Sequence, residues 1–173
     1  SKDLLLIKHS PKNLDEFKGN RGVVQTLGSF IEAKNIPNLI ITGPHGTGKS
    51  TLVKLMIQEY LGEEYFKTGS LEIYGSLSRG IDVVSEKPNL KNKKKNFDCT
   101  NITDFMKKMT NMPVHLLKIV IIYEFHQMST EAQMALRRIM ELNSNRVRFV
   151  FVTQEYGQII QALQSRCTIL KLQ

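Results

Sequence analysis

The sequence predicts an α/β domain with a mostly parallel five-stranded sheet and helices on both faces. Short runs of consecutive apolar residues, which are typical of strands buried on both faces, alternate along the chain with amphipathic helical segments. A glycine-rich loop joins the first of these strands to the helix that follows it. The length of 173 residues, with 41% hydrophobic and 23% charged residues, is that of an ordinary globular domain, so we expect residues 1–173 to form one domain.

Five segments have the composition of strands. The first, at residues 38–42, ends at the glycine-rich loop. The third, at residues 118–124, has four consecutive aliphatic residues before a tyrosine and a glutamate. The other candidates are residues 71–75, 146–153 and 168–172.

Helices are predicted where apolar residues recur at spacings of three and four. They fall at residues 21–34, 51–61, 81–87, 102–110, 130–142 and 159–164. In the segment 130–142, Thr130 followed by Gln133 predicts a capping box at the helix N-terminus.

The chain is basic, because 24 Lys and Arg residues against 16 Asp and Glu give a net charge of +8 and a pI near 9.5. This balance favours a polyanionic partner such as nucleic acid. Part of the excess is a lysine run at residues 91–96, within a loop near residues 88–100. We interpret this run as a solvated loop rather than a dedicated DNA-binding element.

Other features exclude several classes of protein. No run of 18 apolar residues predicts a membrane span, and residues 1–10 do not resemble a secretory signal, so we expect an intracellular protein without a membrane partner. Cys99 and Cys167 are too few for a disulfide framework and lack the spacing of metal ligands. We therefore expect two reduced thiols.

Residues 43–50 read GPHGTGKS and satisfy the phosphate-loop pattern of a glycine, four residues, then Gly-Lys-Ser/Thr. Glycines allow successive backbone N–H groups to surround a phosphate, where a Cβ atom would intrude. Lys49 supplies positive charge to the outer phosphates, and the Ser50 hydroxyl is the type of ligand that Mg²⁺ takes in this loop. A strand before and a helix after the loop complete the context, so the sequence predicts a nucleoside triphosphate site.

Glu124 follows the aliphatic run of the third strand. Ligands of parallel α/β sheets bind outside the carboxyl ends of the strands. Glu124 is therefore expected to face the γ-phosphate and to polarise a water molecule for attack.

The order and spacing of these motifs resemble those of the small subunits of replication factor C, the sliding-clamp loader of the AAA+ class. The resemblance extends from residue 11 to residue 172 and includes ALRRIME at 135–141, RFVFVTQ at 148–154 and SRC at 165–167. It implies an AAA+ P-loop nucleotide-binding domain of the N-terminal type found in those subunits. We expect the lid and collar domains of that family to be absent from this chain.

The resemblance also implies roles for individual residues. Glu124 would be the catalytic carboxylate, and Gln133 would link its strand to the neighbouring helix. Gln154 would sense the γ-phosphate, and Arg166 would act in trans as an arginine finger on the ATP of an adjacent subunit. The residues expected to hold ATP and Mg²⁺ are Gly43, Pro44, His45, Gly46, Thr47, Gly48, Lys49, Ser50 and Thr51.

The partners implied are other clamp-loader subunits in a hetero-oligomeric ring, a sliding clamp and primer–template DNA. The segment SRGIDVV at 78–84 would bring Arg79, Gly80 and Ile81 to phosphates of the duplex. Arg137 and Arg138 fit a solvated, an interfacial or a DNA-facing position equally well. The family implies the nucleus, or a site of viral replication, as the location.

The sequence departs from the family at several positions. Tyr123 stands where members that hydrolyse ATP well carry an aspartate that helps to hold Mg²⁺, and a neutral phenol cannot replace it. Phe125 and His126 replace the small and acidic residues usual after the glutamate, and an isolated His126 is a poor candidate for a metal ligand. Ser10 stands in place of an arginine often found near the phosphates.

We therefore expect an ATP-binding clamp-loader subunit with weak hydrolysis of its own that donates an arginine finger to a neighbour. The first alternative is a fully competent ATPase motor subunit of the same complex, in which Ser50, Glu124 and water hold the metal sufficiently. The second is a P-loop small-molecule kinase, which is less favoured because the sequence has no signature of an acceptor pocket.

Overall fold

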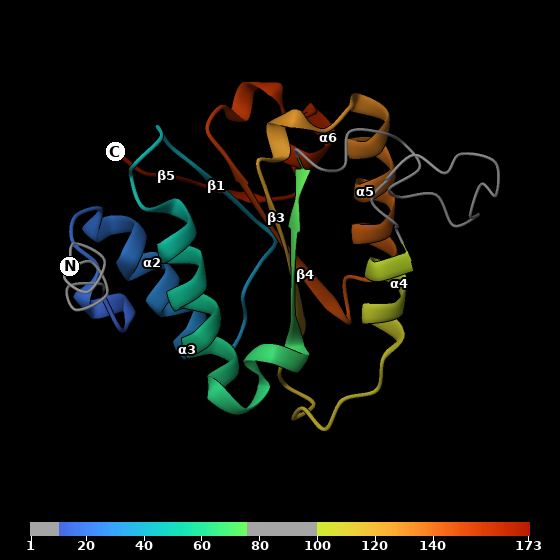
Figure 1. Ribbon diagram of the computed structural model, residues 1–173, viewed down its shortest axis with the longest axis horizontal. Coiled ribbons are helices and arrows are strands. Elements are labelled where there is room, and N and C mark those ends of the chain that lie inside the picture. The colour runs from blue at the N-terminus through green and yellow to red at the C-terminus, as the bar shows by residue number, and fades with distance from the viewer. Residues whose placement is uncertain (1–10, 76–99) are drawn as a thin grey trace, which may run out of the picture.

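The computed structural model describes residues 11–75 and 100–173, which form a five-stranded sheet in the order β2-β3-β4-β1-β5 (Figure 1). All four neighbouring pairs of strands are parallel, so the predicted α/β fold with a mostly parallel sheet is confirmed. The strands are β1 (Leu39–Thr42), β2 (Ser70–Tyr74), β3 (Lys118–Tyr123), β4 (Val147–Thr153) and β5 (Thr168–Lys171).

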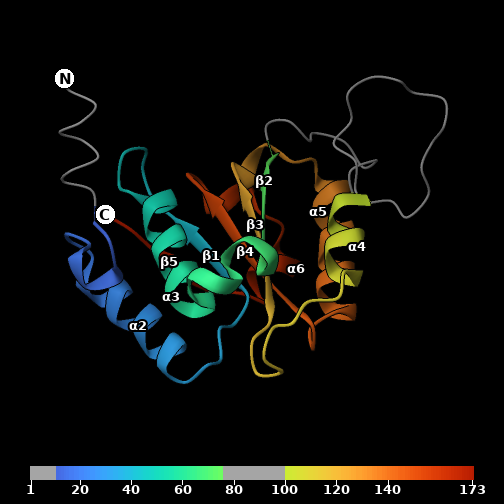
Figure 2. The same cartoon turned by 60° about the horizontal axis from the view of Figure 1, so that its bottom comes forward.

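Helices cover both faces of the sheet. Figure 2 shows α2 and α3 on one face and α4 and α5 on the other. The helices and 3-10 turns are η1 (Leu14–Glu16), α2 (Arg21–Glu32), α3 (Lys49–Gly69), α4 (Thr100–Lys107), η4 (Phe125–Gln127), α5 (Thr130–Leu142), η5 (Tyr156–Gln158) and α6 (Gln161–Gln164). Within residues 11–75 and 100–173, no helix has both the length and the apolar character needed to cross a membrane.

The side chains of each central strand divide between two hydrophobic clusters. In β3, Ile119, Ile121 and Tyr123 pack with α2 and α3, whereas Val120 and Ile122 pack with α4 and α5. All six residues of β3 are buried as a result. This two-sided burial explains why the strand has an unbroken apolar run instead of alternating polar and apolar residues.

The structure confirms one predicted helix end and corrects one predicted helix cap. The predicted helix end at residue 61 is confirmed, because Gly62, with φ 75° and ψ 167°, has non-helical geometry, and a second helical segment follows it to Gly69 within the range given for α3. Helix α5 is capped by Ser129, whose hydroxyl accepts a hydrogen bond from the Ala132 N–H at 3.2 Å. The predicted capping box with Thr130 is therefore incorrect, because the Gln133 side chain is buried and bonds elsewhere.

Candidate functional site

The glycine-rich loop lies between β1 and α3, at the carboxyl end of the sheet. Gly48 is the N-cap of α3 in a left-handed conformation, with φ 84° and ψ 24°, which glycine adopts without a steric penalty. At Gly43, an added Cβ atom would lie 2.7 Å from the Leu172 carbonyl oxygen. The loop is thus packed against the segment after β5, and only glycine fits at that contact.

Lys49 folds back over the loop that it follows. Its Nζ donates hydrogen bonds to the carbonyl oxygens of Gly43 and Pro44, both at 2.7 Å. Burial lowers the pKa of Lys49, because the loop removes part of the water that would stabilise its charge. The Thr47 hydroxyl donates to the Pro44 carbonyl oxygen at 2.8 Å, so its contact is within the loop.

A cavity of about 320 Å³ opens between this loop and the carboxyl ends of three strands. It brings together eight residues that were predicted for the site, six from residues 45–51 together with Glu124 and Gln154. The lining residues are His45, Gly46, Gly48, Lys49, Ser50, Thr51, Tyr74, Tyr123, Glu124, His126, Val152, Thr153 and Gln154. Three other residues of the predicted loop set, Gly43, Pro44 and Thr47, do not line it.

Glu124 is exposed to this cavity and has unusual backbone geometry. Its φ of 53° and ψ of 40° place a residue other than glycine in the left-handed region, at the N-cap of η4. Such conformations are costly and concentrate at functional sites. The turn rests on Gly75, where an added Cβ atom would lie 2.6 Å from the Glu124 carbonyl oxygen.

Tyr123 is buried beside the glutamate, with 3% of its surface exposed. Its hydroxyl donates a hydrogen bond to Glu72 Oε1 at 3.3 Å, and its ring stacks on Tyr74 with centroids 5.1 Å apart. Burial, followed by the charge of Glu72, raises the pKa of Tyr123 well above its usual range. The phenol is therefore neutral and offers no anionic ligand to a cation.

The side chains that line the cavity determine which ions it could hold. Across residues 11–75 and 100–173, no group of three or more His, Cys, Asp or Glu side chains is arranged to hold a metal ion. Ser50 and Glu124 do line the cavity together, so a hydroxyl and a carboxylate are available to a cation that arrives with phosphate oxygens.

Two polar residues that line the cavity, Thr153 and Tyr74, were not predicted as site residues, and neither was the apolar Val152. Thr153, the last residue of β4, is 1% exposed, and its Oγ1 lies 3.1 Å from His126 Nδ1. The same hydroxyl bonds to the backbone of Glu155. Tyr74 ends β2 and stacks on Tyr123. The rule that placed Glu124 at a strand end, applied to the other strands, would have found both.

Gln154 immediately follows β4 and is exposed at the cavity. Its carbonyl oxygen accepts a hydrogen bond from the Thr42 hydroxyl at 3.5 Å, so its backbone is tied to the end of β1. The side chain is thereby placed beside the loop that follows β1.

Gln133 joins different segments from those expected. Its Nε2 donates to the carbonyl oxygens of Met128 and Gln158, both at 3.2 Å, and its Oε1 accepts from the Ile160 N–H at 2.8 Å. It therefore connects α5 to the residue after η4, to the last residue of η5 and to the residue before α6. The expectation that it would bond the strand carrying the glutamate was wrong in this detail.

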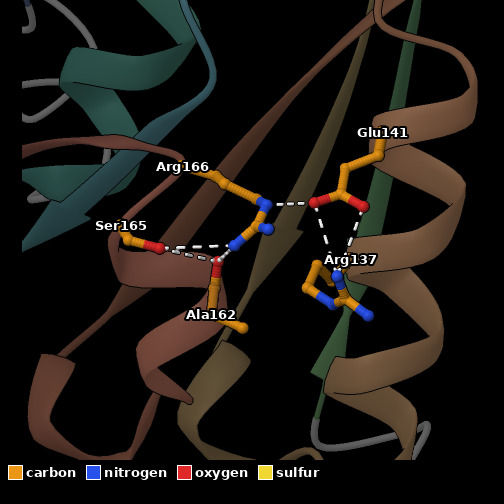
Figure 3. Close-up of polar contacts among 5 residues, drawn as sticks. All are labelled: Arg137, Glu141, Ala162, Ser165 and Arg166. Atoms are coloured by element: carbon orange, nitrogen blue, oxygen red, sulfur yellow. Dashed lines mark hydrogen bonds and ion pairs between the residues drawn. The ribbon is translucent and has the colours of Figure 1, made fainter.

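Arg166 lies two residues after α6 and does not line the cavity of its own chain. Its Nη1 donates to the Ala162 carbonyl oxygen at 2.9 Å, and its Nε forms an ion pair with Glu141 (Figure 3). Arg137 shares that carboxylate at 3.3 Å. Arg138 is exposed.

Some predicted features fall outside the described residues or away from the cavity. Arg79, Gly80, Ile81, Ser10, Cys99 and the lysine run at 91–96 lie outside residues 11–75 and 100–173. Cys167 is a free cysteine, and burial raises the pKa of its thiol to about 12. It is therefore protonated at neutral pH.

Comparison with known sequences identifies relatives of this arrangement. A model of the ATPase family associated with various cellular activities (AAA) matches residues 39–172. Replication factor C subunit 4 of Saccharomyces cerevisiae is 38% identical over 164 residues, which cover 95% of this chain and 46% of that protein. The replication factor C small subunit of Aeropyrum pernix is 34% identical over 96% of this chain and 46% of its own length. These relatives confirm the resemblance predicted from the motifs, and the chain spans about half of their length.

Solved structures show the same fold at lower identity. The RuvB Holliday junction branch migration motor of Thermotoga maritima superimposes with a TM-score of 0.63 and 20% identity, covering 94% of this chain and 48% of that one. A DNA polymerase III gamma subunit-related protein from the same organism gives a TM-score of 0.61 and 19% identity, covering 86% and 45%. At these identities the similarity supports the fold alone.

Proposed function

Because the chain belongs to the ATPase family associated with various cellular activities (AAA), we propose that it is an ATP-binding subunit of a replication factor C-like clamp loader. In this role it helps to open a sliding clamp and load it onto primer–template DNA during DNA replication, in the nucleus or at a site of viral replication. The observation that carries the proposal is that six residues of the phosphate loop line one cavity with Glu124, in a chain similar to replication factor C small subunits over 95% or more of its length.

The loop fits the phosphates of ATP. Helix α3 begins at Lys49, and its first residues line the cavity, so their amide hydrogens and the positive end of the helix would face bound phosphates. Among the described residues, the Lys49 ammonium donates hydrogen bonds to two carbonyl oxygens, which it would exchange for phosphate oxygens. Residues 43–51 would thus hold the nucleotide.

Magnesium fits less well than the nucleotide. Bound magnesium would neutralise charge on the phosphates, with the Ser50 hydroxyl as its protein ligand. Tyr123, which bonds Glu72 and stacks on Tyr74, occupies the position of a carboxylate that would help to fix the metal shell. We therefore infer that ATP binding depends on the loop and that hydrolysis at this site is slow.

The remaining roles belong to side chains at the strand ends and on a neighbour. Glu124 would accept a proton from, or orient, the attacking water, and Gln154 would contact the γ-phosphate. Arg166 would stabilise charge on the phosphate of an adjacent subunit, which makes hydrolysis there depend on assembly. Arg79, Gly80 and Ile81 would contact DNA phosphates.

A single-turnover experiment on the assembled complex tests this proposal against a fully competent ATPase. ATP should bind to the subunit under conditions where hydrolysis at its own site is slow, and DNA binding should weaken steadily as salt is raised. Fast hydrolysis at this site with Tyr123 in place would support the competent motor instead. Failure of the assembled subunit to bind ATP with magnesium present would overturn both readings.

A further inference from the structure

We propose that Glu141 is a positioning residue for Arg166, which it orients toward the ATP of an adjacent subunit. The inference rests on the trans-acting role of Arg166 in the proposed function. Glu141 does not touch a nucleotide itself in this scheme. It acts only through the guanidinium that it holds (Figure 3).

The contacts of Arg166 fix the plane of its guanidinium group. Glu141 pairs with Nε, while the Ala162 carbonyl oxygen and the Ser165 hydroxyl contact Nη1 at 2.9 and 3.4 Å. The structure gives Nη2 no partner among residues 11–75 and 100–173. Because the side chain is 42% exposed, the two hydrogens on Nη2 are available to an anion on another chain.

Glu141 is itself oriented by its own helix. Arg137, one turn earlier on α5, places Nη1 3.4 Å from Glu141 Oε1 and 3.3 Å from Oε2. The carboxylate is therefore held from one side by Arg137 and presents Oε1 to Arg166 on the other. Contacts made by residues four apart on a helix favour such a fixed arrangement.

Charge explains why the carboxylate is needed between the two arginines. Without Glu141, the guanidinium groups of Arg137 and Arg166 would face each other with no counter-charge and repel. Arg166 would then lose the one ion pair that it forms within residues 11–75 and 100–173, and with it the contact that sets its direction. Since the pair is exposed, it is weak enough for Arg166 to adjust when a phosphate approaches.

The first test measures the ion pair of Glu141 with Arg166 in the isolated subunit, before it joins a complex. NMR of the full chain can observe the Nε–H group of Arg166, whose resonance is assigned as the one missing from Arg166→Lys. The hydrogen of this group should exchange slowly with solvent, and the group should have restricted motion. Glu141→Gln should release it, whereas Glu131→Gln, the same charge change at the other end of α5, should not. Equal mobility of this group in wild type and Glu141→Gln would overturn the proposal.

The second test uses the full-length subunit in the assembled complex. Arg166→Ala should lower kcat at the neighbouring site about 1,000-fold. Glu141→Gln should lower it about threefold to fivefold with little change in KM, because an exposed pair makes a small contribution. The double variant should match Arg166→Ala alone, and Glu131→Gln should match wild type.

The outcomes distinguish the positioning role of Glu141 from the trans-acting role of Arg166. A normal Glu141→Gln complex beside an impaired Arg166→Ala complex would overturn only the positioning role. So would a double variant whose loss is the product of the two single losses. An unimpaired Arg166→Ala complex would overturn the trans-acting role in the proposed function, and the positioning role with it.

Discussion

The two sides of the cavity are built in different ways. On one side, the loop at 43–50 presents backbone groups supported by glycines, and Lys49 is its main side-chain contribution. On the other, the end of β3 depends on the side chains of Tyr123 and Glu124 and on a left-handed turn. Backbone amides survive most substitutions, whereas a side-chain function is lost with one. The comparison indicates that ATP binding and hydrolysis can be lost independently.

Among substitutions on the two sides of the cavity, Glu124→Gln gives the largest expected effect, and it changes only the side formed by the end of β3. Loss of the base should reduce single-turnover hydrolysis in the assembled complex by about 100-fold or more, because a positioned acid or base contributes at least that factor. ATP affinity should change little. Glu63→Gln, on the exposed surface of α3, is the matched charge control. Unchanged hydrolysis in Glu124→Gln would remove this residue from the mechanism.

Lys49→Ala tests the loop side. Loss of its charge-assisted hydrogen bonds to phosphate should weaken ATP binding by about 2 kcal/mol, or roughly 30-fold, in isothermal titration calorimetry. Lys54→Ala, on the exposed face of the same helix, should bind as wild type does. If both variants bind equally well, the ammonium of Lys49 is not part of the site.

Tyr123→Asp tests whether a carboxylate at the end of β3 can restore hydrolysis. The new carboxylate should raise single-turnover hydrolysis about tenfold by anchoring the metal. It should also lower the free energy of unfolding by about 3 kcal/mol, since a stacked, buried ring is replaced by a charge. Tyr123→Phe, which keeps the ring and removes the hydroxyl, should not gain activity. A Tyr123→Asp complex with no faster hydrolysis would disprove the metal argument.

The pH dependence of ATP binding should come from the loop side. The pKa of Lys49 is lowered by burial, and bound phosphate favours its charged form. Affinity should therefore be highest below that lowered pKa and fall as pH rises through it, by up to about tenfold per pH unit. Calorimetry across this range checks the slope, which Lys49→Ala should flatten. The same slope in both proteins would assign the titration to another group.

The smallest effect concerns the left-handed turn. Glycine adopts the backbone geometry of Glu124 without strain, whereas alanine does not. Glu124→Gly should therefore exceed Glu124→Ala by about 1 kcal/mol in free energy of unfolding, measured by urea denaturation. Equal stabilities would mean that the turn relaxes when the carboxylate is removed.

Much of the fold could be predicted because the strands are buried on both faces and appear in the sequence as apolar runs. The helix α5 was placed correctly from its spacing, and only its cap was wrong, because Thr130 and Ser129 are both good N-cap residues. The break at Gly62 agrees with the predicted helix end at residue 61, whereas the second helical segment up to Gly69 was not predicted.

The site residues could be predicted where a sequence motif specifies the backbone conformation. They were harder to predict where the site depends on contacts between side chains that are distant in the sequence. Residues of the phosphate loop and Glu124 meet in one cavity, as the strand order requires. The bond from Tyr123 to Glu72 joins residues on neighbouring strands, and the pair of Glu141 with Arg166 joins α5 to the segment after α6. No local pattern contains such pairings, because they depend on the register of the sheet and the packing of helices on it.

The strand order also sets the time at which the ATP site can appear during synthesis. Strand β1, which leads into the loop, pairs with β4 and β5, whose residues lie between 147 and 171. The loop itself touches Leu172. A nascent chain that has been translated through α3 already contains the whole motif and Phe17, which packs against Gly48, but neither of the two strands that flank β1. Competence to bind ATP should therefore arise only when β5 has emerged from the ribosome and joined the sheet.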